Sequence, residues 1–448
     1  MISLSPSWDR ASEPMLSFGV GGLGDVGTWL LSGPAPSEGS EPLGDHVARL
    51  GMLPSLDRPN QLRAVVRDSD LQGRGGGRFP LARKLETALL APGEPIMVVN
   101  ASESEPASRK DHVLCRYRPH LVLDGAAATA AMVGAGEVIV HLHRGSSSVQ
   151  DALIRAMAER KGACLTDPRW RISVGPDRYV SGEASAIASF VDGGEAKPHF
   201  SGIPMAKKGP SGRPTLVNNA ETMAQLAFLL RFGTPFWRSG GAASSPGSQL
   251  LTLAGAVASP GQVIELVGQA TIGEVLVHAG LSAPPAAVLI GGYGGTWLEG
   301  GMAWQVPFER VALGCVGAQP GCGLIGVLPH GACGLVETAR IVRYLAGESA
   351  GQCGPCVAGL PAMAGACEAL GEAKLRRRGL RRLRTLGDLV LGSGACSHPD
   401  GVARLVGSTL DVFEDDVARH LAGRPCRASN HPPVFPVPLG DPLDHVWR

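Results

Sequence analysis

The stretch QGRGGGRFPLARK, Gln72–Lys84, is the part of the sequence that most directly predicts the fold. Four of its residues lack a Cβ: Gly73, Gly75, Gly76 and Gly77. Their backbone can take positive φ values and approach a ligand closely. Because the segment after Pro80 favours a helix, we expect the loop to precede a helix N-terminus, whose free N–H groups and dipole attract anions. Taken alone, the pattern fits both a flat or phosphorylated ligand and a plain surface turn.

Length and composition indicate a large globular protein. A chain of 448 residues is expected to form roughly two to four domains. Hydrophobic residues make up 44% of it, and 62 glycines and 35 prolines indicate many loops. With 41 basic and 40 acidic residues, the chain has no global charge that would attract nucleic acid or a membrane surface.

Nothing in the sequence predicts membrane insertion or secretion. The longest apolar run, Gly125–Gly136, is shorter than a bilayer span. Residues Met1–Arg10 lack a basic region followed by an apolar core, so a cytoplasmic location is expected. The ten cysteines are more typical of metal ligands or reduced core residues than of a disulfide framework.

Residues 1–60 contain a glycine pattern that we interpret as part of an irregular N-terminal arm. Gly19, Gly21 and Gly24 satisfy G-x-G-x-x-G, but Pro34 and Pro36 leave little room for the helix that a dinucleotide fingerprint requires. The glycine-rich loop at 73–77 does not satisfy the pattern either, because Arg78 stands at its third glycine position. The sequence therefore does not support a standard Rossmann site.

Acidic turns follow two predicted elements. The apolar run Pro95–Asn100 predicts a buried strand that ends in NASESEP, so Glu103 and Glu105 are expected at the carboxyl end of a strand, where α/β sheets bind ligands. Tyr179–Val191 repeats the order of strand, Gly-Glu turn and helix, which places Glu183 at a second such turn. Each turn alone also fits an ordinary helix cap.

The rest of this region predicts an α/β sandwich. A buried helix, a strand and an amphipathic helix are expected over Gly125–Val133, Glu137–Leu142 and Ser147–Arg160. The paired amides Asn218 and Asn219 precede a predicted helix over Glu221–Phe232. Side-chain amides both donate and accept hydrogen bonds, which suits the alternating edge of a flavin or a base.

The second half of the chain predicts two further modules. Ser239–Ser248 has the composition of a linker. Short strands around a helix then fit a β-grasp-like module over residues 247–312, with the elements Leu250–Ala254, Gln262–Leu266, Ile272–Ala279 and Ala287–Ile290. Residues 330–425 are expected to be helical, with apolar positions on one face at Leu335, Ala339, Val342 and Leu345. Residues 426–448 form a tail.

Three cysteines in this helical region have the spacing of metal ligands. Cys353 and Cys356 form C-x-x-C, and Cys396 follows in GSGACSHPDG. Thiolates at such spacing bind iron–sulfur clusters or zinc, and spacing does not decide between them. The other cysteines fall into an isolated group, Cys115, Cys164 and Cys426, and a group closer in sequence to the site, Cys315, Cys322, Cys333 and Cys367.

A run of cations lies between Lys374 and Arg384. It consists of Lys374, Arg376, Arg377, Arg378, Arg381, Arg382 and Arg384. A solvated helix face and a docking patch for an acidic electron carrier both fit this run.

Taken in order, these motifs resemble a known family. GRGGGRFP, NASESEP, YVSGEAS, RPTLVNNAET and ESAGQCGPC resemble the ordered signatures of the NADH-binding FMN flavoprotein subunit of respiratory complex I and of NAD-linked diaphorase subunits. The resemblance covers about residues 62–412. It implies a modified Rossmann-like FMN/NADH domain over residues 61–238, then a β-grasp-like module of the SLBB type, then a helical bundle that carries a 4Fe-4S cluster.

The resemblance also implies roles for particular residues. FMN and the dinucleotide would be cradled by Gly73, Arg74, Gly75, Gly76 and Lys84, and flavin would be bound by Asn100, Asn218 and Asn219. Carboxylates at or near the nicotinamide would be Glu103, Glu105 and Glu183, and the rings stacked on adenine would be Phe79 and Phe200. Cys353, Cys356 and Cys396 occupy three cluster-ligand positions.

The chain departs from the family pattern at both cofactor sites. Ala350 replaces the first of four cluster cysteines, and Val357 replaces an arginine. Arg78 replaces a glycine, Ser102 an aspartate and Ala184 a glutamate. An alanine cannot ligate iron, so a fourth cluster ligand would come from another cysteine, His398 or solvent. The family resemblance is therefore that of a diverged member.

The leading hypothesis is a flavoprotein that oxidises NADH or NADPH. Electrons would pass through FMN and a 4Fe-4S cluster to a quinone-reductase complex, a ferredoxin-like carrier or a partner subunit. Two alternatives stay open: a non-catalytic assembly subunit with a decayed dinucleotide site, and a zinc-stapled ligand-binding protein. Neither nucleic acid nor a membrane is expected as a direct partner.

Overall fold

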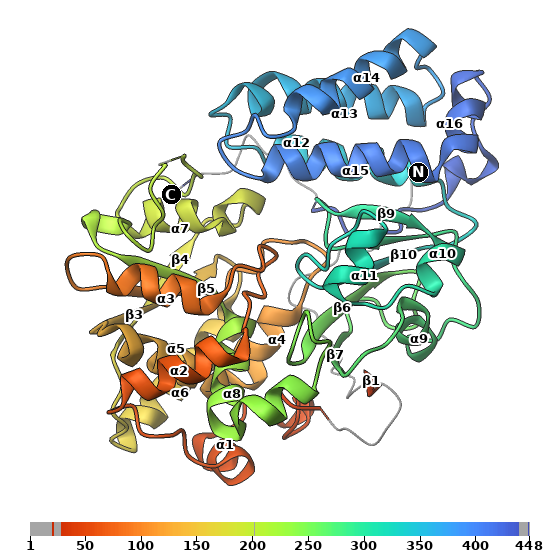
Figure 1. Ribbon diagram of the computed structural model, residues 1–448. Coiled ribbons are helices and arrows are strands. Elements are labelled where there is room, and N and C mark those ends of the chain that lie inside the picture. The colour runs from red at the N-terminus through yellow and green to blue at the C-terminus, as the bar shows by residue number, and fades with distance from the viewer. Residues whose placement is uncertain (1–19, 22–27, 201, 439–446, 448) are drawn as a thin grey trace.

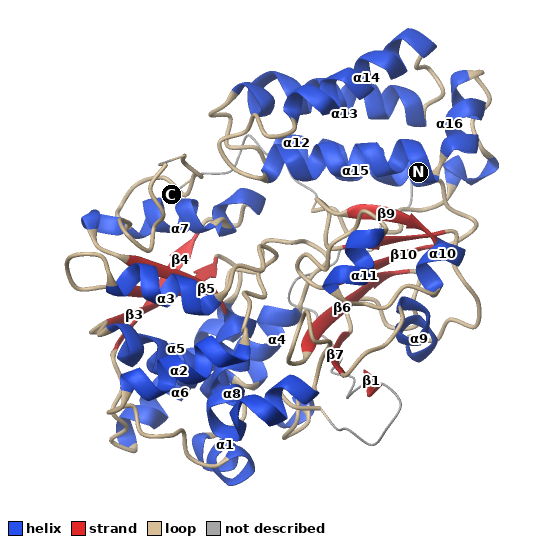
Figure 2. Cartoon of the chain, viewed as in Figure 1, coloured by secondary structure: helices blue, strands red, loops and turns tan. Residues whose placement is uncertain are grey.

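Two sheets and a helical bundle make up the computed structural model of the chain (Figure 1). The structure describes residues 20–21, 28–200, 202–438 and 447. A four-stranded parallel sheet has the order β4-β3-β2-β5, and a six-stranded sheet has the order β1-β7-β6-β10-β8-β9. Figure 2 shows the helical bundle above the six-stranded sheet and beside α7 of the first domain.

The first domain surrounds the parallel sheet. Its strands are β2 (Ile96–Asn100), β3 (Glu137–His143), β4 (Arg169–Gly175) and β5 (Thr215–Asn219). Its helices are α1 (Leu43–Leu50), α2 (Pro59–Ser69), α3 (Leu81–Leu89), α4 (Lys110–Tyr117), α5 (Pro119–Val133), α6 (Ser147–Gly162), α7 (Ala184–Val191) and α8 (Ala220–Ser239). The sheet has helices on both faces, so β2 is apolar along most of its length and buries Met97, Val98 and Val99.

Helices α5 and α8 cross in direct backbone contact. A Cβ at Gly125 would lie 1.9 Å from the carbonyl oxygen of Met223, so only glycine allows this approach. In the sheet, Asn100 at the end of β2 pairs with Asn219 at the end of β5. The carboxyl ends of these neighbouring strands therefore present the two amide side chains at one edge, as expected for a ligand site.

The six-stranded sheet forms the second domain. Its strands are β1 (Val20–Gly21), β6 (Gln249–Gly255), β7 (Val263–Val267), β8 (Ala287–Ile290), β9 (Thr296–Glu299) and β10 (Leu324–Leu328). Its helices are α9 (Ile272–His278), α10 (Gly300–Trp304) and α11 (Arg310–Cys315). The expected elements between residues 250 and 290 are all present, and β10, which pairs parallel with β6, lies beyond the range 247–312.

The C-terminal helices pack as a bundle against this sheet. They are α12 (Gly334–Gly347), α13 (Leu360–Gly371), α14 (Arg377–Val390), α15 (His398–Val412) and α16 (Glu414–Leu421), and a π-helical turn, Pro355–Gly359, precedes α13. The predicted apolar face of α12 is buried at Leu335, Ala339, Val342 and Leu345. After α16 the chain returns across the sheet, where Phe435 packs edge-on against Trp297 with ring centroids 5.8 Å apart.

Two local predictions were wrong. Tyr179–Gly182 forms a 3₁₀ turn rather than a strand. The segment Ser239–Ser248 is not a free linker, because Ser245 and Ser248 are buried and hydrogen-bonded to side chains of the first domain. Small residues permit this close packing, and composition alone cannot distinguish it from flexibility. Of the N-terminal glycine pattern, Gly19 and Gly24 lie outside the described residues.

Within the described ranges, no helix combines the length and the apolar character needed to cross a bilayer.

Candidate functional site

The glycine-rich loop closes on itself and lies against the start of α8. The backbone N–H of Gly73 donates to the carbonyl of Phe79 at 3.0 Å, and the N–H of Arg74 donates to Oγ1 of Thr222 at 2.9 Å. Gly76 has φ +101°, and a Cβ on Gly75 would lie 3.2 Å from Cβ of Asn219. The loop therefore comes as close to the amide-bearing strand end as its missing side chains allow.

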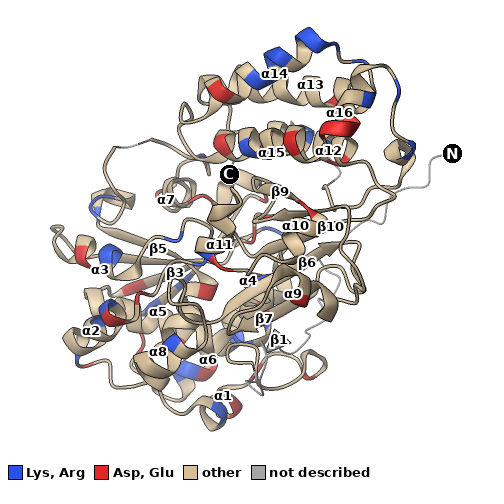
Figure 3. Ribbon diagram, turned by 45° about the vertical axis from the view of Figure 1, so that its right-hand side comes forward, with Lys and Arg blue, Asp and Glu red and all other residues tan. Residues whose placement is uncertain are grey.

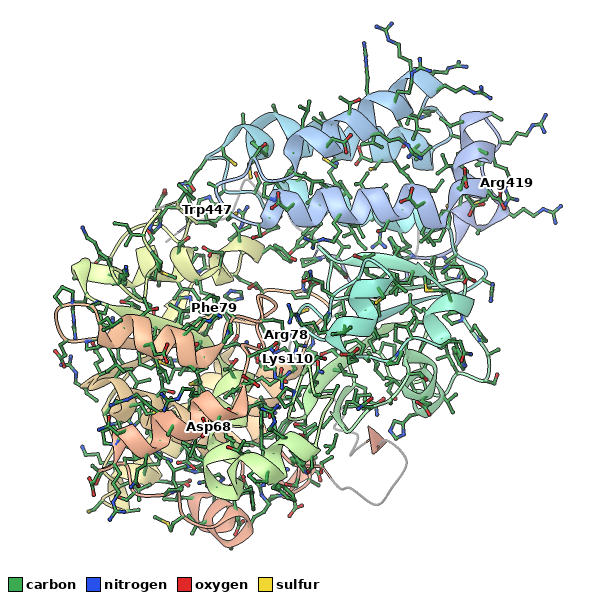
Figure 4. The ribbon with its side chains drawn as sticks, viewed as in Figure 1. Asp68, Arg78, Phe79, Lys110, Arg419 and Trp447 are labelled. Atoms are coloured by element: carbon green, nitrogen blue, oxygen red, sulfur yellow. The ribbon has the colours of Figure 1, made fainter. Side chains whose placement is uncertain are left out.

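Two buried arginine side chains leave this loop toward the second domain. Nη2 of Arg74 donates to the carbonyl of Pro246 at 2.7 Å, and Nη2 of Arg78 donates to Oε1 of Gln249 at 2.6 Å (Figure 4). Arg78 adopts φ +48°, which glycine would take without strain. Burial, followed by repulsion from Arg74, lowers the pKa of Arg78 to about 9. Buried N–H groups of both guanidiniums have no hydrogen-bond partner among the described residues.

Lysine and amide side chains meet at the carboxyl edge of the parallel sheet. Nζ of Lys84 donates to the carbonyl of Val217 at 2.9 Å and to Oδ1 of Asn218 at 3.2 Å. Burial lowers the pKa of Lys84 to about 8. Nδ2 of Asn100 donates to the carbonyl of Gly182 at 2.9 Å. Lys84, Asn100 and Asn218 thus lie at one edge of the sheet.

The predicted aromatic residues lie at the surface. Phe79 ends the glycine-rich loop and is 48% exposed, whereas Phe200 lies on a loop after α7 and is 81% exposed. Such rings are available to stack on a planar ligand. Figure 4 labels Phe79 on the open side of the first domain.

Asn219 belongs to a buried charge network that sequence reasoning missed. Its Nδ2 donates to Oδ2 of Asp111 at 2.6 Å, while its Oδ1 accepts from Nζ of Lys110 at 3.2 Å. Lys110 also donates to Oε2 of Glu221 at 2.8 Å. Burial alone would lower the pKa of Lys110, but Asp111 and Glu221 raise it. The sequence signal was a Lys-Asp pair at the start of a helix that is otherwise largely buried.

The three predicted carboxylates have different surroundings. Oε2 of Glu103 accepts from the backbone of His112 at 2.8 Å, and its Oε1 accepts from the hydroxyl of Ser108. Burial and the neighbouring Asp111 raise the pKa of Glu103 to about 7. Glu183 caps α7 by accepting the N–H of Ser185 at 2.8 Å. Glu103 and Glu183 therefore hold backbone structure in place.

Glu105 alone of the three joins the first domain to the others. Its Oε2 accepts from the N–H of Tyr293 at 2.9 Å and from the hydroxyl of Tyr179 at 3.2 Å. Burial raises its pKa to about 7. In the part of the chain that the structure describes, its buried Oε1 meets no hydrogen-bond donor. Glu105 is therefore suited to hold a proton near neutral pH.

The predicted thiol ligands come together beyond the end of α12. Cys353 and Cys356 are hydrogen-bonded to each other, and Cys396, just before α15, is close enough to perturb Cys356 electrostatically. Burial raises the pKa of Cys356 to about 12, and the hydroxyl of Ser349 is hydrogen-bonded to it. His398, a candidate fourth ligand, directs Nε2 to the carbonyl of Leu345 at 2.8 Å.

A buried ion pair fixes this thiol loop to the first domain. Nε of Arg178 lies 3.1 Å from Oε2 of Glu348, which also accepts the N–H of Tyr179 at 2.7 Å. The ring of Tyr179 contacts that of His398 with centroids 5.5 Å apart. The arginine also lies 4.4 Å from the ring centroid of Trp447. Glu105, Tyr179 and His398 therefore form a continuous chain of contacts from the polar sheet edge to the thiol loop.

The residues present fit FMN and, in part, a 4Fe-4S cluster. The sheet edge offers a lysine, amides and a glycine cradle, and the adjoining guanidiniums retain buried donors that meet no acceptor among the described residues. These groups are those that bind a flavin edge and a phosphate. The thiol loop offers soft ligands from two segments, but Ala350 contributes none, so three of four cluster positions are filled.

The run of cations lies on or just before α14, at the outer side of the bundle (Figure 3). Lys374 pairs with Glu372 at 2.8 Å. The arginines at 377, 378, 381, 382 and 384 are exposed or half-exposed. The helix buries Leu383 and Val390 and turns its charges to solvent.

Comparisons with known proteins agree with this geometry. The Nuo51 FMN-binding domain family matches residues 66–227, and the NADH-ubiquinone oxidoreductase-F iron-sulfur binding region matches residues 337–420. The chain is 28% identical over 386 residues to an NADH-quinone oxidoreductase subunit of Streptomyces coelicolor, covering 82% of this chain and 84% of that protein. The corresponding protein of Mycobacterium bovis is 29% identical over 391 residues, covering 82% and 86%.

Solved structures show the same fold. A chain of an NAD+-reducing NiFe-hydrogenase in the H2-reduced state superposes with a TM-score of 0.75 at 27% identity, covering 82% of this chain and 63% of that one. The air-oxidised state gives 0.76 at 26% identity, covering 91% and 68%. The predicted α/β class with a C-terminal iron–sulfur-binding region is confirmed. The chain is therefore a diverged member of the family of NADH-binding FMN flavoprotein subunits found in respiratory complex I and in NAD-linked diaphorases.

Proposed function

We propose that this chain oxidises NADH or NADPH with bound FMN and passes the electrons to an iron–sulfur partner. The observation that carries the proposal is the contact chain Glu105–Tyr179–His398, which joins the polar sheet edge to the thiol loop. A bound flavin accepts electrons in pairs from a nicotinamide and releases them singly to an iron–sulfur centre. Such transfer requires the two sites to lie near each other, and the contact chain supports this requirement.

The chain's own residues bind, orient and hold a proton. Lys84, with Asn100 and Asn218, would hold the flavin at the sheet edge through charge-assisted and amide hydrogen bonds. The exposed rings of Phe79 and Phe200 would stack on the adenine of the dinucleotide. Glu105, whose pKa is raised by burial to about 7, would take up a proton on the flavin side of Tyr179.

Cys353, Cys356 and Cys396 would hold a 4Fe-4S cluster with one position left to a non-cysteine ligand. Ser349 is the hydroxyl that lies against Cys356, so it joins His398 and solvent as a candidate for that position. The soft thiols of this loop favour iron–sulfur ligation.

The proposed partner is an acidic iron–sulfur protein or subunit. The relatives above are named as subunits of NADH-quinone oxidoreductase. The cationic face of α14 has the charge to steer an acidic protein toward the bundle. A cytoplasmic location is part of the proposal and is supported by the state of the ten cysteines, all of which are free thiols.

A second candidate is a non-catalytic subunit that has kept the fold but lost dinucleotide use. Arg78 favours it, because this side chain fills space between the glycine-rich loop and Gln249 with a buried cation where the family has glycine. The two candidates differ in whether bound flavin is reduced by NADH or NADPH.

The test begins with FMN binding by the full chain and its Lys84→Met variant. Loss of a buried charged hydrogen-bond donor is expected to raise the Kd for FMN about tenfold or more. Arg83→Met, an exposed neighbour on the same helix, is the matched control and should leave the Kd unchanged. Anaerobic addition of NADH or NADPH should then bleach the flavin absorbance. A colourless protein that rejects FMN would overturn the proposal, and bound flavin that neither dinucleotide reduces would favour the second candidate.

A further inference from the structure

A second group of metal-binding side chains lies at the other end of α12. Cys333 is the N-cap residue of α12, His420 lies in the last turn of α16, and Cys426 follows that helix. Their ligand atoms lie within 4.8 Å of one another, and all three residues are buried. Three segments of the chain therefore place two sulfurs and one imidazole nitrogen in a single buried group.

The tautomer of the histidine is fixed by its surroundings. Nδ1 of His420 lies 2.9 Å from the carbonyl of Leu370, which can only accept, so Nδ1 carries the proton. The lone pair of Nε2 then faces the backbone N–H of Cys426 at 2.9 Å. Metal-bound histidines typically donate the other ring N–H to a backbone carbonyl in this way. His420 is thus already oriented to offer Nε2 to a metal, which would displace the N–H of Cys426.

The thiols complete a set that suits zinc. The side chains of Cys333 and Cys426 are hydrogen-bonded to each other. His431 follows five residues after Cys426, and its Cδ2 would lie 3.6 Å from a Cβ on Gly331. Its Nδ1 donates to the carbonyl of Pro432 at 2.6 Å, which leaves Nε2 as the acceptor. Two sulfurs and one or two imidazoles, with a water where needed, form the tetrahedral set that structural zinc sites use.

This group is separate from the thiol loop of the proposed cluster. Helix α12 has 14 residues between Cys333 and the loop that carries Cys353, which corresponds to about 20 Å. The separation excludes Cys333 from the cluster, although its place in the sequence had left that option open. Cys426, which had been interpreted as isolated, also belongs to this second group.

We propose that Cys333, His420 and Cys426 bind a zinc ion, with His431 or water in the fourth position, and that this ion fastens the C-terminal segment to the bundle. That segment is already held by side chains near the site. Glu337 accepts the N–H of Val434 at 3.2 Å, and the hydroxyl of Tyr293 donates to the carbonyl of Pro436. The ion would join α12, α16 and this segment at one point.

Metal analysis of the full chain tests the proposal. Protein purified anaerobically from zinc-containing medium is expected to hold about one zinc per chain. Cys426→Ser and His420→Ala should each lower the zinc content about tenfold or more, with iron content unchanged. Cys367→Ala is the matched control, because Cys367 is equally buried, in α13, and lies outside the group; it should retain zinc. Zinc retained by both ligand variants would overturn the proposal.

A measurement on the unaltered chain covers the case in which the variants do not fold. Zinc is removed with a chelator and replaced with Co2+ alone. Charge-transfer absorbance from thiolate to cobalt and visible d–d bands of tetrahedral intensity are expected. A chain that folds but gives no thiolate–cobalt absorbance, or one in which Cys333 and Cys426 are recovered as a disulfide, would show that these residues do not form a metal site.

Discussion

The two ends of α12 carry thiol groups of different character. At the C-terminal end, Cys353 and Cys396 are partly exposed, and the C-x-x-C spacing alone predicted a metal site there. At the N-terminal end, Cys333 and Cys426 are buried and come from segments that only the fold brings together. One end faces the first domain through an ion pair, and the other holds the returning C-terminal segment. The comparison teaches that partly exposed thiols suit electron exit, whereas buried ones suit fastening.

The sharpest test of this difference exchanges a ligand at the exposed end. Cys356→Ala should remove the cluster, so iron and sulfide content falls about tenfold or more. Zinc content should stay unchanged, because Cys333 and His420 are untouched. Metal analysis and EPR of the reduced protein measure both ends at once. Joint loss of iron and zinc would show that the two ends are not independent.

The ion pair at the exposed end should contribute more to stability than the carboxylate at the other end. Glu348→Gln leaves the guanidinium of Arg178 buried without its charged partner, which costs about 3 kcal/mol of unfolding free energy. Glu337→Gln should cost about 1 kcal/mol, since Glu337 accepts backbone N–H groups and its partner Arg340 is partly exposed. Urea unfolding compares the two variants. Equal losses would contradict the assigned difference.

The pH dependence of stability should be steeper on the side of the first domain. Burial raises the pKa of Glu105 from 4.5 to about 7, so between these values the folded state binds more protons than the unfolded state. Stability should therefore fall as pH rises from about 4.5 to 7, by up to about 3 kcal/mol. Glu105→Gln should remove this part of the slope, as seen in unfolding midpoints at several pH values. An unchanged slope would assign the effect to Glu103, whose pKa is also raised to about 7.

The smallest expected effect comes from restoring the family pattern. Ala350→Cys supplies a fourth thiol to the loop of Cys353 and Cys356 and should raise cluster occupancy about two- to threefold after aerobic handling. Iron per chain before and after exposure to air is the measurement. Gly351→Cys, one residue along the same loop, is the control. A variant no better than this control would indicate that the fourth position is already filled by another ligand.

Much of this architecture could be predicted from local patterns. The apolar run before Asn100 is a buried parallel strand, and the acidic turn after it does lie at the carboxyl edge of the sheet. The cysteines at 353, 356 and 396 do come together. These features rest on residues near one another in sequence or on a periodicity that packing must satisfy.

What the sequence could not predict depends on distant partners. Lys110 is buried because Asp111 and Glu221 neutralise it, and Glu221 lies on another helix. Glu103 and Glu183 resemble catalytic carboxylates in sequence, yet their oxygens accept backbone N–H groups. Nothing in the residues next to Cys333 indicates His420. Side chains whose role is set by tertiary contacts carry no local signal.

The packed segment 239–248 has a mechanical consequence. Arg74 holds the carbonyl of Pro246, and Gln225 holds Ser248, so the connection between the two sheets is bonded to the first domain along its length. A hinge needs backbone that is free to change its dihedral angles, and this segment has little such freedom. The two domains should therefore move as one body, and the spacing between flavin edge and thiol loop would be set by packing rather than sampled by domain swings.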